Sequence, residues 1–520
     1  MTLPHDEEHD HEDDDVPDDP DPDAMDVDRR YALTDMGNAE RLVRRHGRDI
    51  HYIYAWAKWL GWTGRYWRID DTGAVERAAK ATVRHMYREA ARIPDPGKRQ
   101  DLFVHAGKSE SATRLAAMIR LAQSEPGIAI THDQLDRDHW VLPLRNGTLD
   151  LCTGELRASR REDMCTRHVP INWDPSAQCP MWTRFVTEIM GGNANLIAFI
   201  QRAVGYSLTG SVREQVLFFL VGDGSNGKST FILTLLEMLG DYAIQAAPDL
   251  LLAKKGEVHP TEQSDLFGRR VAACVEVEKG RAFAEVTLKQ LTGSDRIRSR
   301  RMREDFWEFF PTHKLWISAN HKPIVRGTDL AIWRRLLLIP FDVTFTDDRK
   351  DTELPAKLRG ELPGILAWAM EGCRAWQCDG LKPPDAVLHE TAKYRAEMDV
   401  LGQFVSEKCV VDPRAKVGAT ELYRAYVTWS EAAGDAPQKQ RGFGHAMTER
   451  GFPRQKDGHA NTVTYQGIRL RVLNDADEAD DADEDPVSTA CKSPRVELTG
   501  GSSASSAYRE LALDFRGGKS

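Results

Sequence analysis

The chain has 520 residues, of which 41% are apolar, and this length and composition suffice for several folded domains with hydrophobic cores. It contains no run of 18 apolar residues and no basic-then-apolar leader, so we expect neither a membrane-spanning segment nor secretion. The eight cysteines are scattered and form no CxxC pair, which argues against a zinc ribbon or a disulfide framework and for a reduced, cytoplasmic setting.

Acidic residues are concentrated near the two ends of the chain. Residues 1–28 contain 14 Asp and Glu and no Lys or Arg, and residues 475–485 contain eight acidic residues and no basic one. Without these 22 acidic residues the net charge of −10 becomes +12. We therefore expect disordered acidic tails over 1–28 and 474–520 around a basic body that suits a polyanion such as nucleic acid. Basic residues that serve only solubility are the alternative.

Residues 29–180 combine helical and strand patterns, so we expect a mixed α+β domain there. Apolar residues recur at helical spacing in Ala39–Gly47 and in Glu76–Ile93. The segment Leu144–Arg157 has the pattern of a β-hairpin. Tryptophans between the two helices could stack on bases, but packing on a small sheet is the favoured interpretation. They are Trp56, Trp59, Trp62 and Trp67.

Residues 181–345 alternate predicted strands with predicted helices, which indicates an α/β domain with a central parallel sheet. Val216–Val221 is a continuous apolar run suited to a strand buried on both faces, and Phe231–Leu239 has a helical pattern that ends at Gly240. A loop with the pattern Gly-x4-Gly-Lys-Ser joins the two, as in a phosphate-binding loop. The residues predicted to bind a nucleoside triphosphate are Gly222, Asp223, Gly224, Ser225, Asn226, Gly227, Lys228, Ser229 and Thr230.

Each part of this loop has a physical role in phosphate binding. Glycines let backbone N–H groups approach the phosphates, and the following helix directs the positive end of its dipole toward them. Lys228 is expected to contact the β- and γ-phosphates, and Ser229 is expected to bind Mg²⁺. We therefore expect ATP and Mg²⁺ as cofactors. A glycine-rich turn without a ligand is the alternative.

A second apolar strand within Arg269–Gly280 ends in two acidic residues, Glu276 and Glu278. Alternation puts both carboxylates on one side of the strand. A bound triphosphate needs an acidic residue to hold the metal ion and to polarise the attacking water. Glu276 is our first choice for both roles, and Glu278 is the second choice. An acidic strand end at the protein surface is the alternative interpretation.

Two further segments carry polar residues next to predicted strands. Asn320 follows the strand Lys314–Ser318, where an amide could sense the γ-phosphate through a water molecule or simply form a turn. Arg334 and Arg335 precede the strand Leu336–Phe341, and one of them could reach the phosphate of a neighbouring subunit as an arginine finger. Arg335 is slightly preferred over Arg334, and a structural salt bridge is the alternative role for either.

A stretch rich in basic residues, Leu288–Asp305, lies between the second and third predicted strands. Arginines alternate in it, so an extended hairpin would present several of them on one face and could contact a nucleic-acid backbone. A solvated helix face is the alternative. The residues predicted to bind DNA are Lys289, Arg296, Arg298, Arg300, Arg301 and Arg303.

The last third of the chain has two predicted parts before the acidic tail. Residues 346–395 have a helical, connecting character, and residues 396–473 contain three predicted helices and a predicted strand, Thr462–Val472. This pattern is similar to a winged-helix module, which would bind DNA or, nearly as readily, dock on protein. The predicted helices are Leu401–Val411, Thr420–Gly434 and Arg441–Gly451.

The motifs GDGSNGKST, VEVE, LKQLTGSDRIRSR, KLWISANHKP and WRRLLLIPF follow one another in the order and spacing of a superfamily 3 helicase. Over residues 33–345 the chain resembles the helicase half of phage and plasmid primase-helicases, the group that includes the poxvirus primase-helicase. The resemblance implies an AAA+-like P-loop core, a hexameric ring, ATP hydrolysis between subunits and single-stranded DNA threaded through the centre. It also implies that Lys228 and Ser229 form the phosphate-loop pair and that Asn320 is the sensor.

Residues 29–180 offer neither paired carboxylates on strands nor the Cys/His cluster of a primase, so we predict a helicase without a recognisable primase domain. The predicted function is ATP-dependent replicative DNA unwinding for a phage or mobile element, in a bacterial cytoplasm. The expected partners are single-stranded DNA at a replication fork, other copies of the chain, and a separate primase or polymerase, without a membrane. The alternatives are an origin-binding initiator that uses ATP as a structural switch, and another P-loop DNA motor.

Overall fold

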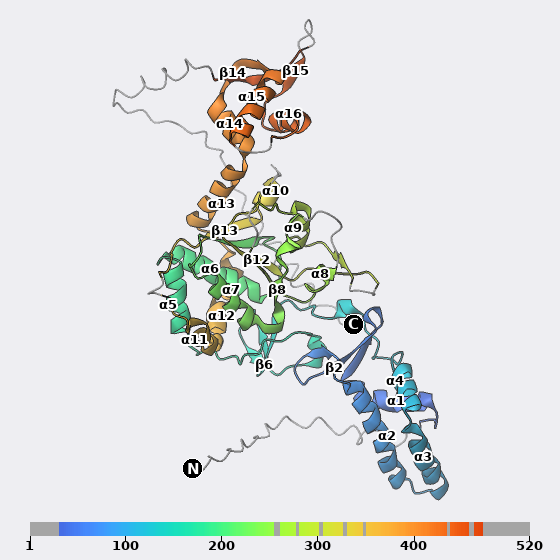
Figure 1. Cartoon of the computed structure of the whole chain (residues 1–520). Helices are drawn as coiled ribbons and strands as arrows, with labels where there is room; N and C mark the ends of the chain where they lie inside the picture. The colour runs from blue at the N-terminus through green and yellow to red at the C-terminus, as the bar shows by residue number, and fades with distance from the viewer. Residues whose placement is uncertain are drawn as a thin grey trace, which may run out of the picture. The chain divides into compact units, whose positions relative to one another are not determined.

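The computed structural model describes residues 31–253, 261–276, 280–300, 305–325, 330–346, 350–433, 437–456 and 462–471. The chain divides into two compact units, Met1–Gln403 and Phe404–Ser520 (Figure 1), and each is described by itself. Glu278, Arg301 and Arg303 lie outside the described residues. Across the described ranges, no helix is both long and apolar enough to span a membrane.

The first unit begins with a bundle of helices, coloured blue to cyan in Figure 1. Side chains cap the starts of three of them: Thr34 accepts a hydrogen bond from the Gly37 amide, and Asp95 and Ser111 cap the third and fourth helices in the same way. Apolar side chains from all four helices share one core. The two helices predicted here correspond to the first two. The helices are α1 (Asp35–His46), α2 (Ala74–Arg92), α3 (Pro96–Ser109) and α4 (Ala112–Ala122).

Two small antiparallel sheets belong to the same region. In the first, Trp56 and Trp67 are buried, and the Trp67 ring N–H donates to the Arg161 carbonyl over 2.9 Å, so these tryptophans pack as the sequence predicted. In the second, the turn of the predicted hairpin contains Gly154 with a φ of 78°, a conformation that favours glycine. The strands are β1 (Ile50–Ile53), β2 (Lys58–Trp62) and β3 (Trp67–Ile69), then β4 (Val141–Leu144), β5 (Gly147–Asp150) and β6 (Leu156–Arg157).

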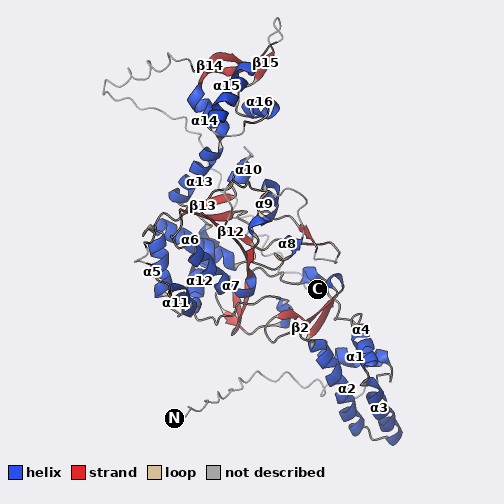
Figure 2. Cartoon of the chain, in the orientation of Figure 1, coloured by secondary structure: helices blue, strands red, loops and turns tan. Residues whose placement is uncertain are grey.

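The centre of the first unit is a five-stranded sheet whose neighbouring strands are all parallel, in the order β13-β7-β12-β9-β8. Figure 2 shows its strands in red with helices packed around them. The predicted α/β class with a central parallel sheet is therefore confirmed. The strands are β7 (Leu217–Val221), β8 (Ala243–Ala246), β9 (Val271–Val275), β12 (Lys314–Ala319) and β13 (Leu336–Pro340).

Both faces of this sheet are buried, which explains the continuous apolar run of its first strand. Phe218 and Leu220 of β7 point into one hydrophobic core, whereas Leu217, Phe219 and Val221 point into the other. Most helical side chains in the first core come from four helices, and the second core contains side chains from short elements and from the Trp56 region. The four helices are α5 (Pro180–Ile189), α6 (Ala194–Leu208), α7 (Lys228–Leu239) and α12 (Leu362–Asp379).

The region predicted as a helical connector contributes directly to this core through α12. Helices α6 and α12 approach so closely that a Cβ on Gly205 would lie 2.0 Å from the Cys373 amide nitrogen, and a Cβ on Gly372 would lie 2.0 Å from the Gln201 carbonyl oxygen. The other elements of this unit are short or peripheral. They are α8 (Thr261–Ser264), α9 (Glu285–Leu291), β10 (Ile297–Ser299), β11 (Trp307–Phe309), α10 (Leu330–Trp333), α11 (Leu354–Gly360) and α13 (Asp385–Met398).

The described part of the second unit contains three helices and an antiparallel sheet of order β14-β16-β15. The three predicted helices and the predicted strand are present, with one correction. The first helix ends at Lys408, and Cys409–Val411 instead begin a strand, as their β-branched valines favour. Phe404, Tyr426 and Phe443 pack together beneath the sheet. The elements are α14 (Val400–Lys408), β14 (Cys409–Gly418), α15 (Ala419–Ala432), α16 (Gln440–Glu449), β15 (Arg454–Lys456) and β16 (Val463–Leu470).

Candidate nucleotide site and basic hairpin

The order of strands brings together three segments that are far apart in the sequence. Strand β12 lies between β7 and β9, with Ala319 paired to Val221 and Ser318 paired to Val275. Since the strands are parallel, the residues that follow them meet at one edge of the sheet, where α/β proteins bind ligands. Asn320 is therefore placed between the glycine-rich loop and Glu276.

The glycine-rich loop adopts a shape that requires glycine at two positions. Gly222 and Gly227 have φ values of 155° and 85°, and a Cβ on Gly222 would lie 2.4 Å from the Phe341 carbonyl oxygen. A Cβ on Gly227 would lie 2.7 Å from the Ile189 side chain. The backbone N–H of Phe345 donates to the Ser225 carbonyl over 2.8 Å. The packed segments around the loop thus fix its course before any ligand binds.

Lys228 begins helix α7 and its side chain is buried across the mouth of the loop. Its ammonium group donates to the Gly222 carbonyl over 2.6 Å and to the Asn226 side-chain oxygen over 3.0 Å. Burial lowers the pKa of Lys228, and the nearby Asp223 carboxylate partly opposes that shift. The Asn226 amide nitrogen in turn donates to the Phe341 carbonyl over 3.1 Å. The loop thus already coordinates the ammonium with oxygens, which phosphate oxygens could replace.

Oxygen groups suited to a magnesium ion lie next to this lysine and at the neighbouring strand end. Ser229 is in the first turn of α7 and is exposed, so its hydroxyl is accessible. Glu276 is exposed directly after β9, with a φ of 63°, and its backbone N–H donates to the Ser318 carbonyl over 2.9 Å. A hydroxyl and a carboxylate are hard oxygen donors of the kind that Mg²⁺ prefers, so the residues present fit this ion. Asn320 is exposed beside them.

The two arginines before β13 differ in environment. Arg335 is buried, and its guanidinium donates to the Ala331 carbonyl over 2.6 Å. The Arg334 side chain is exposed and makes no ion pair among the described residues. Both lie at the amino end of β13, which is about 16 Å along the sheet from the phosphate loop for five residues at ~3.3 Å each. Neither arginine can therefore reach the loop of its own chain without a large rearrangement.

The arginine-rich stretch forms a short hairpin of β10 and β11, with Arg298 opposite Glu308. Arg296, Arg298 and Arg300 are all exposed, whereas Ile297 and Ser299 between them are buried. The predicted extended hairpin with these arginines on one face is confirmed. Lys289 is separate from that face, since it is half-buried on α9.

Two phenylalanines share the exposed hairpin face, and the motif search missed them. The Arg298 and Arg300 guanidinium groups lie 4.6 and 4.7 Å from the centre of the Phe306 ring, and Arg296 lies 4.8 Å from that of Phe310. Phe306 is 46% exposed and Phe310 is 57% exposed. In FWEFF, exposed Phe306 and Phe310 alternate with buried Trp307 and Phe309, and this period-two pattern could have revealed the face. We use the name hairpin face for Arg296, Arg298, Arg300, Phe306 and Phe310.

The opposite side of the hairpin is buried against aromatic rings. The Trp307 ring lies 5.7 Å from the Trp56 ring and 5.2 Å from the Phe267 ring, and Phe309 lies 5.6 Å from Phe267. These edge-to-face contacts are stabilising beyond simple burial. They attach the hairpin to the first small sheet and keep the hairpin face directed outward.

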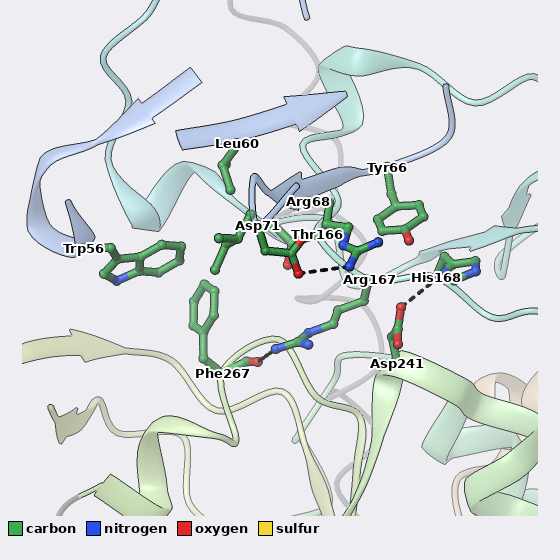
Figure 3. A pocket seen from close by; sticks show the side chains of 11 residues that line it. Trp56, Leu60, Tyr66, Arg68, Asp71, Thr166, Arg167, His168, Asp241 and Phe267 are labelled. Atoms are coloured by element: carbon green, nitrogen blue, oxygen red, sulfur yellow. Dashed lines mark hydrogen bonds and ion pairs between the residues drawn. The ribbon is translucent and has the colours of Figure 1, made fainter. Parts of the chain in front are cut away.

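A cavity of about 420 Å³ lies where the first small sheet meets the core around the parallel sheet (Figure 3). The Tyr66 ring stacks on His168 at 4.5 Å, and His168 bonds to the Asp241 carboxylate over 2.8 Å. That hydrogen bond from His168 holds the pKa of Asp241 below its usual value. Asp241 follows α7 closely, so this cavity connects the N-terminal region to the end of the helix that starts at Lys228, and it is separate from the glycine-rich loop.

Two family descriptions match the chain. Residues 39–191 match "D5 N terminal like", and residues 220–335 match a family of unknown function named DUF5906. Together they cover the helical bundle, the small sheets, the glycine-rich loop and the hairpin.

Among curated proteins, the chain is similar to "Putative helicase 022R" of Frog virus 3 (isolate Goorha), 29% identical over 45% of this chain and 26% of the relative. It is also similar to "Putative helicase L207/L206" of Acanthamoeba polyphaga mimivirus, 24% identical over 57% of this chain and 33% of the relative. The chain thus spans a third or less of these relatives. The matches support a helicase-type or primase-helicase-type family.

The solved structure of the "NrS-1 C terminal region" aligns with 80% of this chain and 95% of that chain, at 8% identity and a TM-score of 0.45. The fold assignment rests instead on the parallel sheet described above.

Proposed function

We propose that the chain is an ATP-dependent DNA helicase of superfamily 3, of the primase-helicase type and without primase activity. One observation carries this proposal: the strand order brings Asn320 and Glu276 beside the glycine-rich loop. A loop alone would support only nucleotide binding, whereas a sensor amide and an acidic residue next to it support hydrolysis. The core would then be an AAA+-like P-loop ATPase.

The residues at this edge of the sheet have separate proposed roles in hydrolysis. Lys228 exchanges its two present oxygen partners for β- and γ-phosphate oxygens. Ser229 and Glu276 hold Mg²⁺, which when bound neutralises phosphate charge. Asn320 orients a water molecule, and Glu276 accepts its proton as the water oxygen bonds to the γ-phosphorus. The bond from that phosphorus to the bridging oxygen breaks, and the products are ADP and inorganic phosphate.

The proposed active enzyme is a homo-oligomeric ring, a hexamer by resemblance, in which a neighbouring subunit supplies an arginine finger. Arg334 is the candidate finger, since it is exposed while Arg335 is tied to its own helix through the Ala331 carbonyl. This assignment reverses the slight preference for Arg335 that the sequence gave. A finger from a neighbouring subunit stabilises charge that develops in the transition state.

The hairpin face is the proposed contact for single-stranded DNA, with Lys289, Arg301 and Arg303 as further candidates from the sequence. The helices and sheet of the second unit support a winged-helix module that binds DNA or a partner protein. The replication fork and a separate primase or polymerase remain the proposed partners. We also propose that the chain comes from a phage or mobile element and acts in a bacterial cytoplasm. The two named relatives come from Frog virus 3 and Acanthamoeba polyphaga mimivirus.

The test is the rate of ATP hydrolysis with and without single-stranded DNA, for the wild type and for Lys228→Ala. We expect DNA to stimulate the wild type, and Lys228→Ala to lower the rate about 100-fold or more, as for loss of other transition-state contacts. Lys357→Ala is a matched control, because Lys357 is a surface residue paired with Asp351. Hydrolysis that DNA does not stimulate would contradict the motor and favour the origin-binding initiator, and strand displacement by Lys228→Ala would refute the assigned site.

A further inference from the structure

Helix α2 has two faces of opposite character. Its apolar side chains, including Ala79, Val83 and Met86, are buried in the core of the helical bundle. At about 100° per residue, the five basic side chains fall within about 120° on the opposite face of the helix. All five are exposed. They are Arg77, Lys80, Arg84, Arg88 and Arg92, which we call the α2 stripe.

No acidic residue shares the α2 stripe. Three alanines of α2 also lie at those angles: Ala81 and Ala91 are exposed, and Ala74 in the first turn is half-buried. Of the two acidic residues on α2, Glu89 lies on a flank, where it pairs with Arg41 at 3.6 Å. Among the described residues, none of the five stripe side chains makes an ion pair. Arg77 donates only to the Thr72 carbonyl and hydroxyl.

Such a row of like charges is unfavourable for an isolated helix. Lys80, Arg84, Arg88 and Arg92 follow one another at intervals of four residues, and like charges at that spacing repel, whereas exposed helix faces gain stability from alternating signs. The repulsion is relieved when an external polyanion binds along the helix. The arrangement therefore favours a ligand with regularly spaced negative charges.

We propose that the α2 stripe binds the phosphate backbone of duplex DNA. From Arg77 to Arg92 the helix rises about 22 Å, at 1.5 Å per residue, which spans several phosphates of one strand. The face has no aromatic side chain, so it cannot stack on unpaired bases as single-strand-binding surfaces do. The contact is independent of base sequence and of ATP hydrolysis. If the proposed helicase function is correct, the α2 stripe holds the duplex DNA while the hairpin face binds the single strand.

The experiment measures binding of the full chain to a blunt 30-base-pair duplex by fluorescence anisotropy, across a series of salt concentrations. The variant replaces Lys80, Arg84, Arg88 and Arg92 with Gln, a good helix former, so that α2 is retained. We expect affinity to fall 10- to 100-fold and the slope of log K against log salt to become shallower by up to about 3.6, at ~0.9 per contact. Unchanged circular dichroism and basal ATPase activity verify the fold.

A matched control replaces four surface arginines that already have acidic partners: Arg114, Arg137, Arg184 and Arg359, paired with Asp35, Asp133, Glu188 and Glu237. This control should keep the wild-type duplex affinity and salt slope. The proposal is overturned if the α2 variant also keeps both. If the stripe instead binds an acidic protein segment, the α2 variant should keep its duplex affinity and salt slope but bind a peptide of residues 1–28 more weakly than the wild type does. Because basal ATPase activity is measured separately, failure here leaves the proposed helicase function standing.

Discussion

The hairpin face and the α2 stripe are two basic surfaces of one unit, and they differ in what lies between the charges. Arginines of the hairpin face lie over Phe306 and Phe310, whereas the gaps in the α2 stripe hold only alanines. Aromatic rings stack on unpaired bases, whereas a row of cations without rings binds phosphates whether or not the bases are paired. A comparison of net positive charge alone would not distinguish the two surfaces.

The two surfaces also differ in how the protein supports them. The hairpin strands have three residues each, and an isolated two-stranded hairpin is marginal in water, so the hairpin depends on Trp307 and Phe309 packing beneath it. The α2 stripe lies on a 19-residue helix with its own core. The position of the hairpin face therefore depends on packing from outside its own strands, whereas the α2 stripe is held by the core of the helical bundle.

The largest expected effect concerns Arg334, an exposed cation that belongs to neither surface. If Arg334 is the finger, Arg334→Ala should lower ATP hydrolysis by about 1,000-fold while duplex and single-strand affinities stay at wild-type values. Mixing Arg334→Ala with Lys228→Ala should restore part of the rate, because some interfaces then combine an intact loop with an intact finger. No recovery in the mixture would argue that Arg334 does not act across subunits.

Arg335→Ala is the matched comparison for Arg334. Since Arg335 is buried and donates to the Ala331 carbonyl, its loss should lower the thermal midpoint of unfolding before it affects the catalytic step. A variant with wild-type stability and the same loss of hydrolysis as Arg334→Ala would reverse the assignment of the two residues.

The second effect separates the two surfaces directly. Replacing Arg296, Arg298 and Arg300 with Ala should weaken single-stranded DNA binding on the order of 100-fold and remove DNA stimulation of hydrolysis, because about three phosphate contacts are lost. The α2 variant should retain that stimulation. Equal losses of stimulation in both variants would mean that the surfaces form one continuous binding site.

A smaller effect tests the aromatic half of the hairpin face. The double substitution Phe306→Ala and Phe310→Ala should weaken binding of single-stranded DNA about tenfold, because each lost stacking contact with a base is worth roughly 1 kcal/mol or more. The salt dependence of binding should not change. An abasic strand of the same length supplies the control, since it has phosphates but no bases. The wild type and the double variant should bind that strand equally. A variant that loses affinity for it as well would show that the rings merely order the arginines.

Sequence patterns predicted much of this arrangement, and where they did not the reasons are physical. The glycine-rich loop and the strands are local features with strong periodicity, so their positions followed from the residues. Strand order did not, and it alone brings Asn320 between the loop and Glu276. Nor could the pattern Trp-Arg-Arg separate Arg334 from Arg335, because burial depends on how α10 packs against its surroundings. Strand β14 was missed where helical spacing continues into β-branched residues.

The smallest effect concerns the junction between the first small sheet and the core around the parallel sheet, through His168 and Asp241. Because the hydrogen bond with His168 lowers the folded pKa of Asp241, this contact stabilises the fold above the pKa of an unfolded aspartate, about 3.9, and that contribution is lost as pH falls through the lower folded pKa. His168→Gln should cost about 0.5 kcal/mol at pH 7, since both groups are partly exposed and screened.

The measurement is the urea midpoint of unfolding for the wild type and His168→Gln, at pH 7 and at pH values below 3.9. The difference in midpoint should shrink at the acidic end, because Asp241 is then protonated in both proteins. His389→Gln, on α13 outside the cavity, is the control and should show no such pH-dependent difference. If the His168→Gln difference is the same at every pH, ring packing against Tyr66 rather than the hydrogen bond to Asp241 holds the junction.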